Sequence, residues 1–302
     1  MGVKEKDTVG KRVGIQLAYP LEEKRILTWT PPYIVQPKLD GERCRAILDP
    51  SQPYPASVTL VSSEGNYFQS VPHLLEPLHK VAQLTGPIEL DGELYHKGYS
   101  FEQIHSIVGR TVNLSSNHEE IQLWVFDLVN ETLPQWERLK ILGRVKSLST
   151  SPELQFVQTK LVESFEEILK AYEEFIRDGY EGIIIRHVDA TYVRRRSLFM
   201  LKFKPKKEDT YKIVGFKQMV DKYGQPKEML GALVCISNDG EEEFNVGSGM
   251  DDYFRRSNWP ASVAASLVGK LVRVKYQHIT SGRVPRFPVF VEVIEPMINP
   301  LL

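Results

Sequence analysis

The sequence has little cysteine, no sustained apolar run and almost no net charge. Its two cysteines, Cys44 and Cys235, lie far apart in a chain of 302 residues. Neither a disulfide framework nor a zinc site is expected. Both cysteines should be free thiols in a reducing compartment. No stretch approaches the roughly 20 apolar residues that cross a membrane, and the polar N-terminus lacks an apolar signal segment. We therefore expect a protein without membrane association that is not secreted. It should be cytoplasmic, or nuclear or in a viral factory if its source is a eukaryotic virus.

The net charge of −1 neither favours nor excludes nucleic acid as a partner, but the distribution of charge is informative. Residues 190–217 carry nine Lys and Arg against two acids, and residues 269–286 carry five against none. Two basic surfaces on a nearly neutral chain would bind polyphosphate locally without indiscriminate attraction. The sequence therefore favours a local polyphosphate-binding surface.

Length and periodicity predict two domains of different class. Up to Lys207, apolar strand-like segments alternate with helical patterns, including a capping box at Ser164 and Glu167 that opens a helix stopped by Gly179. After Lys207 only short β segments remain, with a short helix near residues 251–259. The expected strands cover residues 211–217, 230–237, 242–246, 270–277 and 287–294. We place the domains at residues 1–207 and 208–302.

A lysine at the end of the apolar run 33–37 begins the tetrapeptide Lys38-Leu39-Asp40-Gly41. A strand end can hold the amine of Lys38 at the floor of a pocket, where it could act as a covalent nucleophile. Asp40 could orient this amine or help to place a metal. Gly41 would let the backbone turn away beneath a nucleotide.

Four further motifs follow in order, and each joins polar groups to a predicted strand. In the first, carboxylates at period two lie on one face of a predicted strand, and in the second an aromatic ring and an acid lie on the next strand. In the third, a glutamate precedes a buried strand. In the fourth, two lysines share one face of a further strand. These motifs are Glu89-Asp91-Glu93, Phe126-Asp127, Glu181-Gly182 and Lys202-Lys204.

With the Lys38 tetrapeptide, these motifs resemble the covalent nucleotidyltransferases, and among them the minimal, Chlorella-virus type of ATP-dependent DNA ligase. The resemblance covers about residues 30–295 and includes the C-terminal segments 231–233, 246–250 and 285–290. It implies an α+β fold. A nucleotidyltransferase (ATP-grasp-like) domain of antiparallel sheets with helices should be followed by a small all-β OB-fold barrel.

The same resemblance implies roles for individual residues, with ATP and Mg²⁺ as cofactors and Mn²⁺ as a substitute for Mg²⁺. Catalysis would involve Lys38, Asp40, Lys202 and Lys204. Nucleotide binding would involve Gln36, Lys38, Arg43, Glu93, Phe126, Glu181, Lys202 and Lys204, and the metal would be held by Glu93 and Glu181. Nucleic acid would be contacted by Arg43, Arg194, Arg195, Arg196, Lys206, Lys207, Lys275, Arg283 and Arg286.

We predict a monomeric enzyme that seals nicks with a 3′-hydroxyl and a 5′-phosphate in duplex DNA through a lysyl-AMP intermediate. An RNA ligase, or one that accepts mixed RNA/DNA nicks, stays open because the catalytic motifs do not separate these substrates. An mRNA-capping guanylyltransferase is less favoured, and an NAD-dependent ligase is disfavoured by the absence of zinc cysteines. A nucleic-acid-binding protein with an inactive nucleotidyl domain is the alternative of a different class.

Three features depart from the family pattern. Ser63 stands where the family has an arginine that helps to grip phosphate, so this grip must come from elsewhere. Residues 218–230 suffice for a tight hairpin but not for an arm that encircles the duplex. Ile294 occupies the position of a basic residue that orients pyrophosphate, and Lys275, Arg283 or Arg286 are its possible substitutes.

Overall fold

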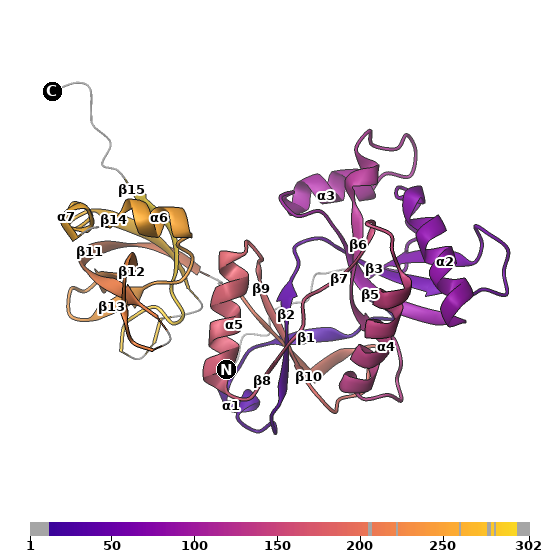
Figure 1. Cartoon of the computed structure of the whole chain (residues 1–302), viewed down its shortest axis with the longest axis horizontal. Helices are drawn as coiled ribbons and strands as arrows, with labels where there is room; N and C mark the ends of the chain where they lie inside the picture. Colours follow the sequence, from indigo (N-terminus) through magenta and orange to yellow (C-terminus); the bar gives the residue numbers. More distant parts are fainter. Residues whose placement is uncertain are drawn as a thin grey trace, which may run out of the picture. The chain divides into compact units, whose positions relative to one another are not determined.

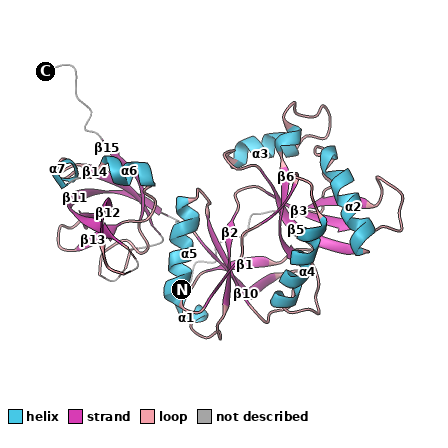
Figure 2. Ribbon diagram, viewed as in Figure 1, coloured by secondary structure: helices cyan, strands magenta, loops and turns pink. Residues whose placement is uncertain are grey.

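The computed structural model describes residues 12–204, 207–221, 223–259, 261–276, 279–280 and 282–294. These residues form three five-stranded sheets with helices packed around them (Figures 1 and 2). Both cysteines are free and buried, as the sequence predicts. No helix in the described ranges is long and apolar enough to cross a bilayer.

The first sheet carries the predicted nucleophile. Its strand order is β1-β10-β9-β2-β8, and β1 runs parallel to β10 whereas β10 pairs antiparallel with β9. The strands are β1 (Leu17–Pro20), β10 (Arg196–Phe203), β9 (Gly182–His187), β2 (Tyr33–Lys38) and β8 (Lys160–Val162). Residues 33–37 of β2 are buried whereas Lys38 is half-buried, so the apolar run anchors the strand and delivers the amine at its end.

The second sheet carries the carboxylates and the aromatic ring, in the order β4-β3-β5-β6-β7. Its strands are β4 (Val58–Ser62), β3 (Glu42–Leu48), β5 (Ile88–Tyr95), β6 (Gln122–Leu128) and β7 (Leu154–Phe156). Helices α2 (Leu75–Thr85) and α4 (Gln135–Leu148) lie side by side against this sheet (Figure 1). Helix α3 (Phe101–Val108) contacts β3 and β5, and its N-terminus is closed by a capping box between Ser100 and Gln103.

The predicted amphipathic helices form with small differences at their ends. In α5 (Phe165–Arg177) the N–H of Glu167 donates to Ser164 Oγ at 3.2 Å, while the Glu167 carboxylate accepts from the N–H of Glu163. The capping box therefore closes one residue earlier than expected. Gly179, with a φ of 86°, follows the helix, as the sequence predicts. Short helix α1 (Glu23–Ile26) and two 3₁₀ turns (Pro72–Leu74 and His118–Glu120) complete this region.

The C-terminal strands form an open sheet in the order β13-β12-β11-β14-β15. They are β11 (Lys207–Val220), β12 (Pro226–Ile236), β13 (Glu243–Val246), β14 (Leu271–Tyr276) and β15 (Val289–Ile294), with α6 (Asp252–Ser257) and α7 (Ala261–Ala265) between β13 and β14. The predicted OB-type barrel is therefore not closed. Within the described ranges, a single parallel bridge between Ser248 and Val289, rather than a ladder, links the two ends of this sheet.

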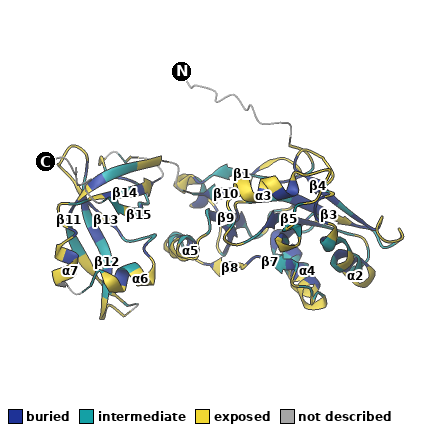
Figure 3. Ribbon diagram, turned by 90° about the horizontal axis from the view of Figure 1, so that it is seen from above, coloured by how far each residue is buried: buried dark blue, intermediate teal, exposed yellow. Residues whose placement is uncertain are grey.

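The hairpin between β11 and β12 is tight, because their pairing extends to Val220 opposite Pro226. This confirms the prediction of a hairpin in place of an encircling arm. Buried residues follow the strands of each sheet, and exposed residues cover the outer faces of the helices (Figure 3).

The chain divides into two compact units. The first contains residues up to Ala171 together with Ile183–Phe203, and the second contains Tyr172–Gly182 together with Lys204 onward. The boundary between residues 207 and 208 stays a prediction.

Candidate nucleotide and nick-binding site

Lys38 lies where β2 ends, and the chain after it passes close to β5. A Cβ on Gly41 would lie 2.4 Å from the carbonyl oxygen of Leu94 and 3.0 Å from Glu93 Cγ. Glycine is therefore required here for the close approach of two backbones, which is a different reason from the turn expected from the sequence. Lys38 itself is half-buried, and its charge acts on Glu93. Asp40 is exposed beside them.

Arginines on β3 neutralise two of the three carboxylates on β5. Arg45 pairs with Glu89, and Arg43 makes a bidentate contact with fully buried Asp91 at 2.7 and 2.5 Å. Asp91 thus supports the site and does not face solvent. Glu93 forms no ion pair with any residue in the described ranges. The third carboxylate is left to face the end of β2.

Burial raises the pKa of Glu93 to about 8, against the opposing charges of Arg43 and Lys38. Without ligand, this carboxyl is therefore largely protonated near neutral pH. A cation placed beside Glu93 would favour its ionised form, so the site is suited to receive positive charge together with a nucleotide.

Replacing Glu93 by glutamine should change how stability depends on pH. The folded state holds the proton up to about pH 8, whereas the unfolded chain releases it near 4.5. The contribution of this group is complete below the unfolded pKa and is lost as pH rises through the folded pKa. In the absence of ATP and metal, the wild-type Tm should therefore fall relative to Glu93→Gln from about pH 4.5 to about pH 8, and the difference should be constant above that. A difference in Tm between wild type and Glu93→Gln that stays constant over this pH range would contradict the prediction.

A buried polar network, which the sequence did not reveal, joins the two sheets of the first unit. Gln36 on β2 donates to the carbonyl of Phe126 on β6 at 3.0 Å and accepts from Arg186 Nε at 2.9 Å. Arg186 in turn donates to Asp127 at 2.8 Å, and Asp127 also accepts from Arg138 Nε at 2.9 Å. These buried groups fix the end of β2 relative to β6.

The side chain of Gln36 is 1% exposed, and its oxygen and nitrogen both bond to protein. The structure thus gives Gln36 a positioning role, and contact with a base stays a prediction. The only sign of this network in the sequence is an acid in the apolar strand 124–128. Its partners Arg138 and Arg186 are distant in the chain, so their proximity could not be inferred.

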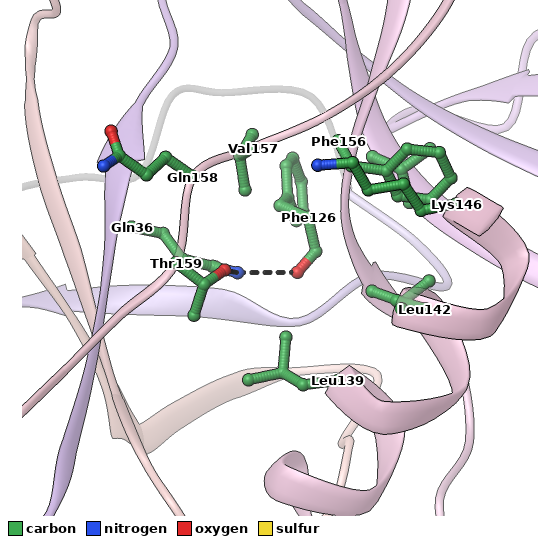
Figure 4. A pocket seen from close by; sticks show the side chains of 11 residues that line it. Gln36, Phe126, Leu139, Leu142, Lys146, Phe156, Val157, Gln158 and Thr159 are labelled. Atoms are coloured by element: carbon green, nitrogen blue, oxygen red, sulfur yellow. Dashed lines mark hydrogen bonds between the residues drawn. The ribbon is translucent and has the colours of Figure 1, made fainter.

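Phe126 lies beside Gln36 and contacts two cations. The guanidinium carbons of Arg43 and Arg186 are 4.6 and 5.5 Å from its ring centroid. The ring also borders a pocket of about 330 Å³ between β6, α4 and the segment that follows β7 (Figure 4). Its walls are mostly apolar, with the Lys146 amine at one side. A planar base is the kind of ligand that such a ring and pocket accommodate.

The two predicted lysines lie where β10 ends: Lys202 is within β10, which pairs with β9, and Lys204 directly follows β10. Lys202 is half-buried and opposite Ile184 in the register. Just beyond the last pair, Phe203 with Ile183, Lys204 forms an ion pair with Glu181. The alternation Lys202-Phe203-Lys204 thus places buried Phe203 between two polar side chains, as the sequence predicts.

Comparison with known proteins decides the family. The family described as "ATP dependent DNA ligase domain" matches residues 16–204, and "DNA ligase OB-like domain" matches residues 223–293. This chain belongs to the ATP-dependent DNA ligase family. It is therefore an enzyme of the nucleotidyltransferase class, and the predicted resemblance is confirmed.

Relatives of the ligase range from bacteria to viruses. The DNA ligase of Haemophilus influenzae is 26% identical over 204 residues, which cover 68% of this chain and 71% of that protein. The DNA ligase of Enterobacteria phage T4 is 25% identical over 266 residues, which cover 73% of this chain and 53% of that protein. This ligase thus spans about half the length of the T4 enzyme.

Two solved structures share the fold of the ligase. Chlorella virus DNA ligase-adenylate matches with a TM-score of 0.66 at 22% identity, over 93% of this chain and 98% of the other. The ATP-dependent DNA ligase from bacteriophage T7, in complex with ATP, matches with a TM-score of 0.70 at 18% identity and the same coverage. The expected α+β class with a following OB-like domain is confirmed.

In the folded protein, acidic side chains lie beside several basic residues of the two runs 190–217 and 269–286 that suggest DNA contact. Arg194 pairs with Glu89 and Glu131. On the C-terminal sheet, Lys275 approaches Glu208 at 3.8 Å, and Arg273 lies between Glu208 and Glu292. The run 269–286 contains no acid, but neighbouring strands supply them, which corrects the expectation of a purely basic surface.

The remaining predicted DNA contacts have mixed surroundings. Arg283 pairs with Asp239 and Glu241, and Arg286 stacks over Phe287 at 4.2 Å. Arg196 donates to the carbonyl of Ala18. Arg195 and Lys207 are exposed, and Lys206 lies outside the described residues. Contact of these residues with nucleic acid stays a prediction.

Proposed function

We propose that the ligase seals 3′-hydroxyl/5′-phosphate nicks in duplex DNA through a lysyl-AMP intermediate on Lys38. The neutral amine attacks the α-phosphorus of ATP, and a P–N bond forms as the bond to pyrophosphate breaks. An oxygen of the nick 5′-phosphate then attacks the same phosphorus and releases the lysine. Finally, the 3′-hydroxyl attacks the 5′-phosphate and AMP leaves. Each step is a phosphoryl substitution, which depends on positioning and charge neutralisation.

The observation that carries this proposal is the meeting of three groups at the junction of the two sheets. Lys38 ends β2, and Glu93 lies within its electrostatic influence. The backbone of Phe126 is held at the same junction by the bond from Gln36 to its carbonyl, and its ring contacts Arg43, whose charge also acts on Glu93. A nucleophile, a carboxylate without an ion-pair partner in the described ranges and an aromatic platform suit a nucleotide that reacts at its α-phosphate. Lys202 and Lys204 supply charge for phosphate oxygens.

Two carboxylates without histidine or cysteine ligands suit a hard divalent ion that keeps several water molecules. In the described ranges, no three His, Cys, Asp or Glu side chains gather, whereas Mg²⁺ is commonly held by one or two carboxylates with water and substrate phosphates. Glu93 and Glu181 would hold such an ion, and we propose Mg²⁺ with Mn²⁺ as a substitute. When bound, it would neutralise charge on the phosphates of ATP.

Phe126→Leu should weaken ATP binding with little loss of stability. Leucine keeps most of the apolar volume but removes the ring, and stacking of a base on an aromatic ring contributes about 1–3 kcal/mol. The KM for ATP in self-adenylylation should therefore rise by roughly tenfold or more, while the Tm stays within a few degrees of wild type. A normal KM with a lower Tm would mean that Phe126 serves packing alone.

The function is tested by incubating the protein with α-labelled ATP or GTP and separating the products on a denaturing gel. A labelled protein band with ATP but not with GTP is expected. Matched duplexes with one nick in DNA, RNA or mixed strands then define the polynucleotide, and we expect the DNA nick to be sealed fastest. Absence of any labelled protein band would refute the covalent mechanism, and faster sealing of RNA would refute the assignment of DNA as substrate.

A further inference from the structure

The side-chain amide of Gln36 is held by protein groups at both its oxygen and its nitrogen, and their chemistry fixes its orientation. Its oxygen accepts from Arg186 Nε at 2.9 Å, and its nitrogen donates to the carbonyl of Phe126 at 3.0 Å. A guanidinium has only donors and a carbonyl oxygen only accepts, so a reversed amide would lose both bonds. Arg186 is itself buried and donates to Asp127 at 2.8 Å. The amide is therefore locked with its nitrogen toward Phe126.

The second N–H of this locked amide determines what the hydroxyl of Thr159 can do. Gln36 Nε2 lies 3.1 Å from Thr159 Oγ1 and donates to it. Because the hydroxyl oxygen accepts this bond, its own proton is directed away from Gln36 and is available to a third group. Within the described ranges, Thr159 donates to no residue. The sequence gives no sign of this relay, because Thr159 lies 123 residues from Gln36.

Thr159 lines the same pocket of about 330 Å³ as Gln36 and the Phe126 ring. Figure 4 shows the Gln36 nitrogen and the Thr159 side chain side by side at one wall of this pocket. Gln158 and Lys146 also line it, but neither forms a hydrogen bond to a residue in the described ranges. Thr159 is therefore the polar group that the buried network holds ready for a ligand, and a bond to a group held in this way costs less ordering.

We propose that Thr159 donates its hydroxyl proton to a ring nitrogen of the adenine of ATP, and that Gln36 is the positioning residue that orients this hydroxyl. The inference rests on the proposed function, which places the base of ATP against Phe126. Three ring nitrogens of adenine carry a lone pair and no hydrogen, so each is an acceptor for a hydroxyl whose oxygen already accepts from Gln36. The base is then recognised through the relay from Arg186 to Gln36 to Thr159, and not by Gln36 directly.

The experiment measures self-adenylylation of the full chain over a range of ATP concentrations. Thr159→Val keeps the shape of the side chain without its hydroxyl, so the KM for ATP should rise roughly threefold to tenfold. The rate at saturating ATP should stay at the wild-type level, because the base is not the reacting group. Thr159→Ser keeps the hydroxyl and should keep the wild-type KM. The matched control is Thr150→Val, at an exposed threonine that lines a different pocket, and its KM should also be that of wild type.

Analogues of ATP identify the acceptor atom. In 1-deaza-, 3-deaza- and 7-deaza-ATP, one ring nitrogen of adenine is replaced by C–H. For wild type, one of these analogues should show the same rise in KM, and Thr159→Val should use that analogue as well as wild type does, because the bond is already absent.

The inference is overturned if Thr159→Val keeps the wild-type KM for ATP or if Thr159→Ser is impaired as much as Thr159→Val. It is also overturned if Thr159→Val raises the KM for ATP and for all three analogues by the same factor. Failure of wild type to form lysyl-AMP would instead refute the proposed function, so the two failures are distinguishable.

Discussion

Lys38→Ala should abolish the covalent adenylate. No other lysine in the chain precedes Leu-Asp-Gly, and Lys38 is the amine that ends β2 beside Glu93. Lys38→Arg should fail equally, because a guanidinium stays protonated and cannot act as a nucleophile. The measurement is the labelled protein band formed with α-labelled ATP, which should disappear in both variants while their Tm stays near that of wild type.

A pre-adenylylated nick provides the control for this prediction. The final step does not need a free amine on the enzyme to receive AMP, so Lys38→Ala should retain part of its sealing activity on a nick that already carries 5′-AMP. A labelled band that survives either substitution would show that another residue carries AMP. Loss of the band together with a large drop in Tm would show that Lys38 supports the fold.

Asp127→Asn should be the most destabilising single substitution among those considered in the first unit. Asp127 is completely buried and accepts hydrogen bonds from Arg138 and Arg186. Burial lowers the pKa of Arg186, and the charge of Asp127 opposes that effect. Removal of the carboxylate leaves two buried guanidinium groups without their counter-ion, which typically costs about 3–5 kcal/mol. Denaturation in urea should show this loss as a lower midpoint.

Glu131→Gln is the matched control, because Glu131 also pairs with an arginine, Arg194, but its side chain is 58% exposed. An exposed ion pair contributes about 0–1 kcal/mol, so this variant should unfold close to wild type. Equal midpoints for Asp127→Asn and Glu131→Gln would mean that the buried network contributes no more than a surface pair. The proposed rigid link between β2 and β6 would then be abandoned.

The sequence predicted the strands of the site because each carries a strong local signal. The apolar run 33–37 becomes β2, the alternation at Lys202 becomes β10, and the five β segments after Lys207 become β11 to β15. Period two also placed Glu89, Asp91 and Glu93 on one face of β5, where Arg45 and Arg43 meet the first two. These features depend on neighbouring residues, so they can be read from sequence.

Other expectations failed or could not be formed because they depend on distant residues. The run 269–286 contains only basic charges, but Glu208 and Glu292 on adjacent strands pair with it. The C-terminal strands were correctly found, yet closure of a barrel depends on pairing between its end strands, and one bridge forms in the described ranges.

By itself, the sequence determined the order of the motifs and the ligase family, and it predicted Lys38 as the nucleophile, because each is encoded in short stretches of chain. Only the tertiary structure decided which carboxylate lacks an arginine partner and how β2 is held against β6. It also brought the backbone of Val13 beside that of Ser63. The physical reason is that burial and pairing of charge depend on residues that are distant in the chain. Gln36, Asp127 and Arg186 acquire their partners only when the two sheets come together.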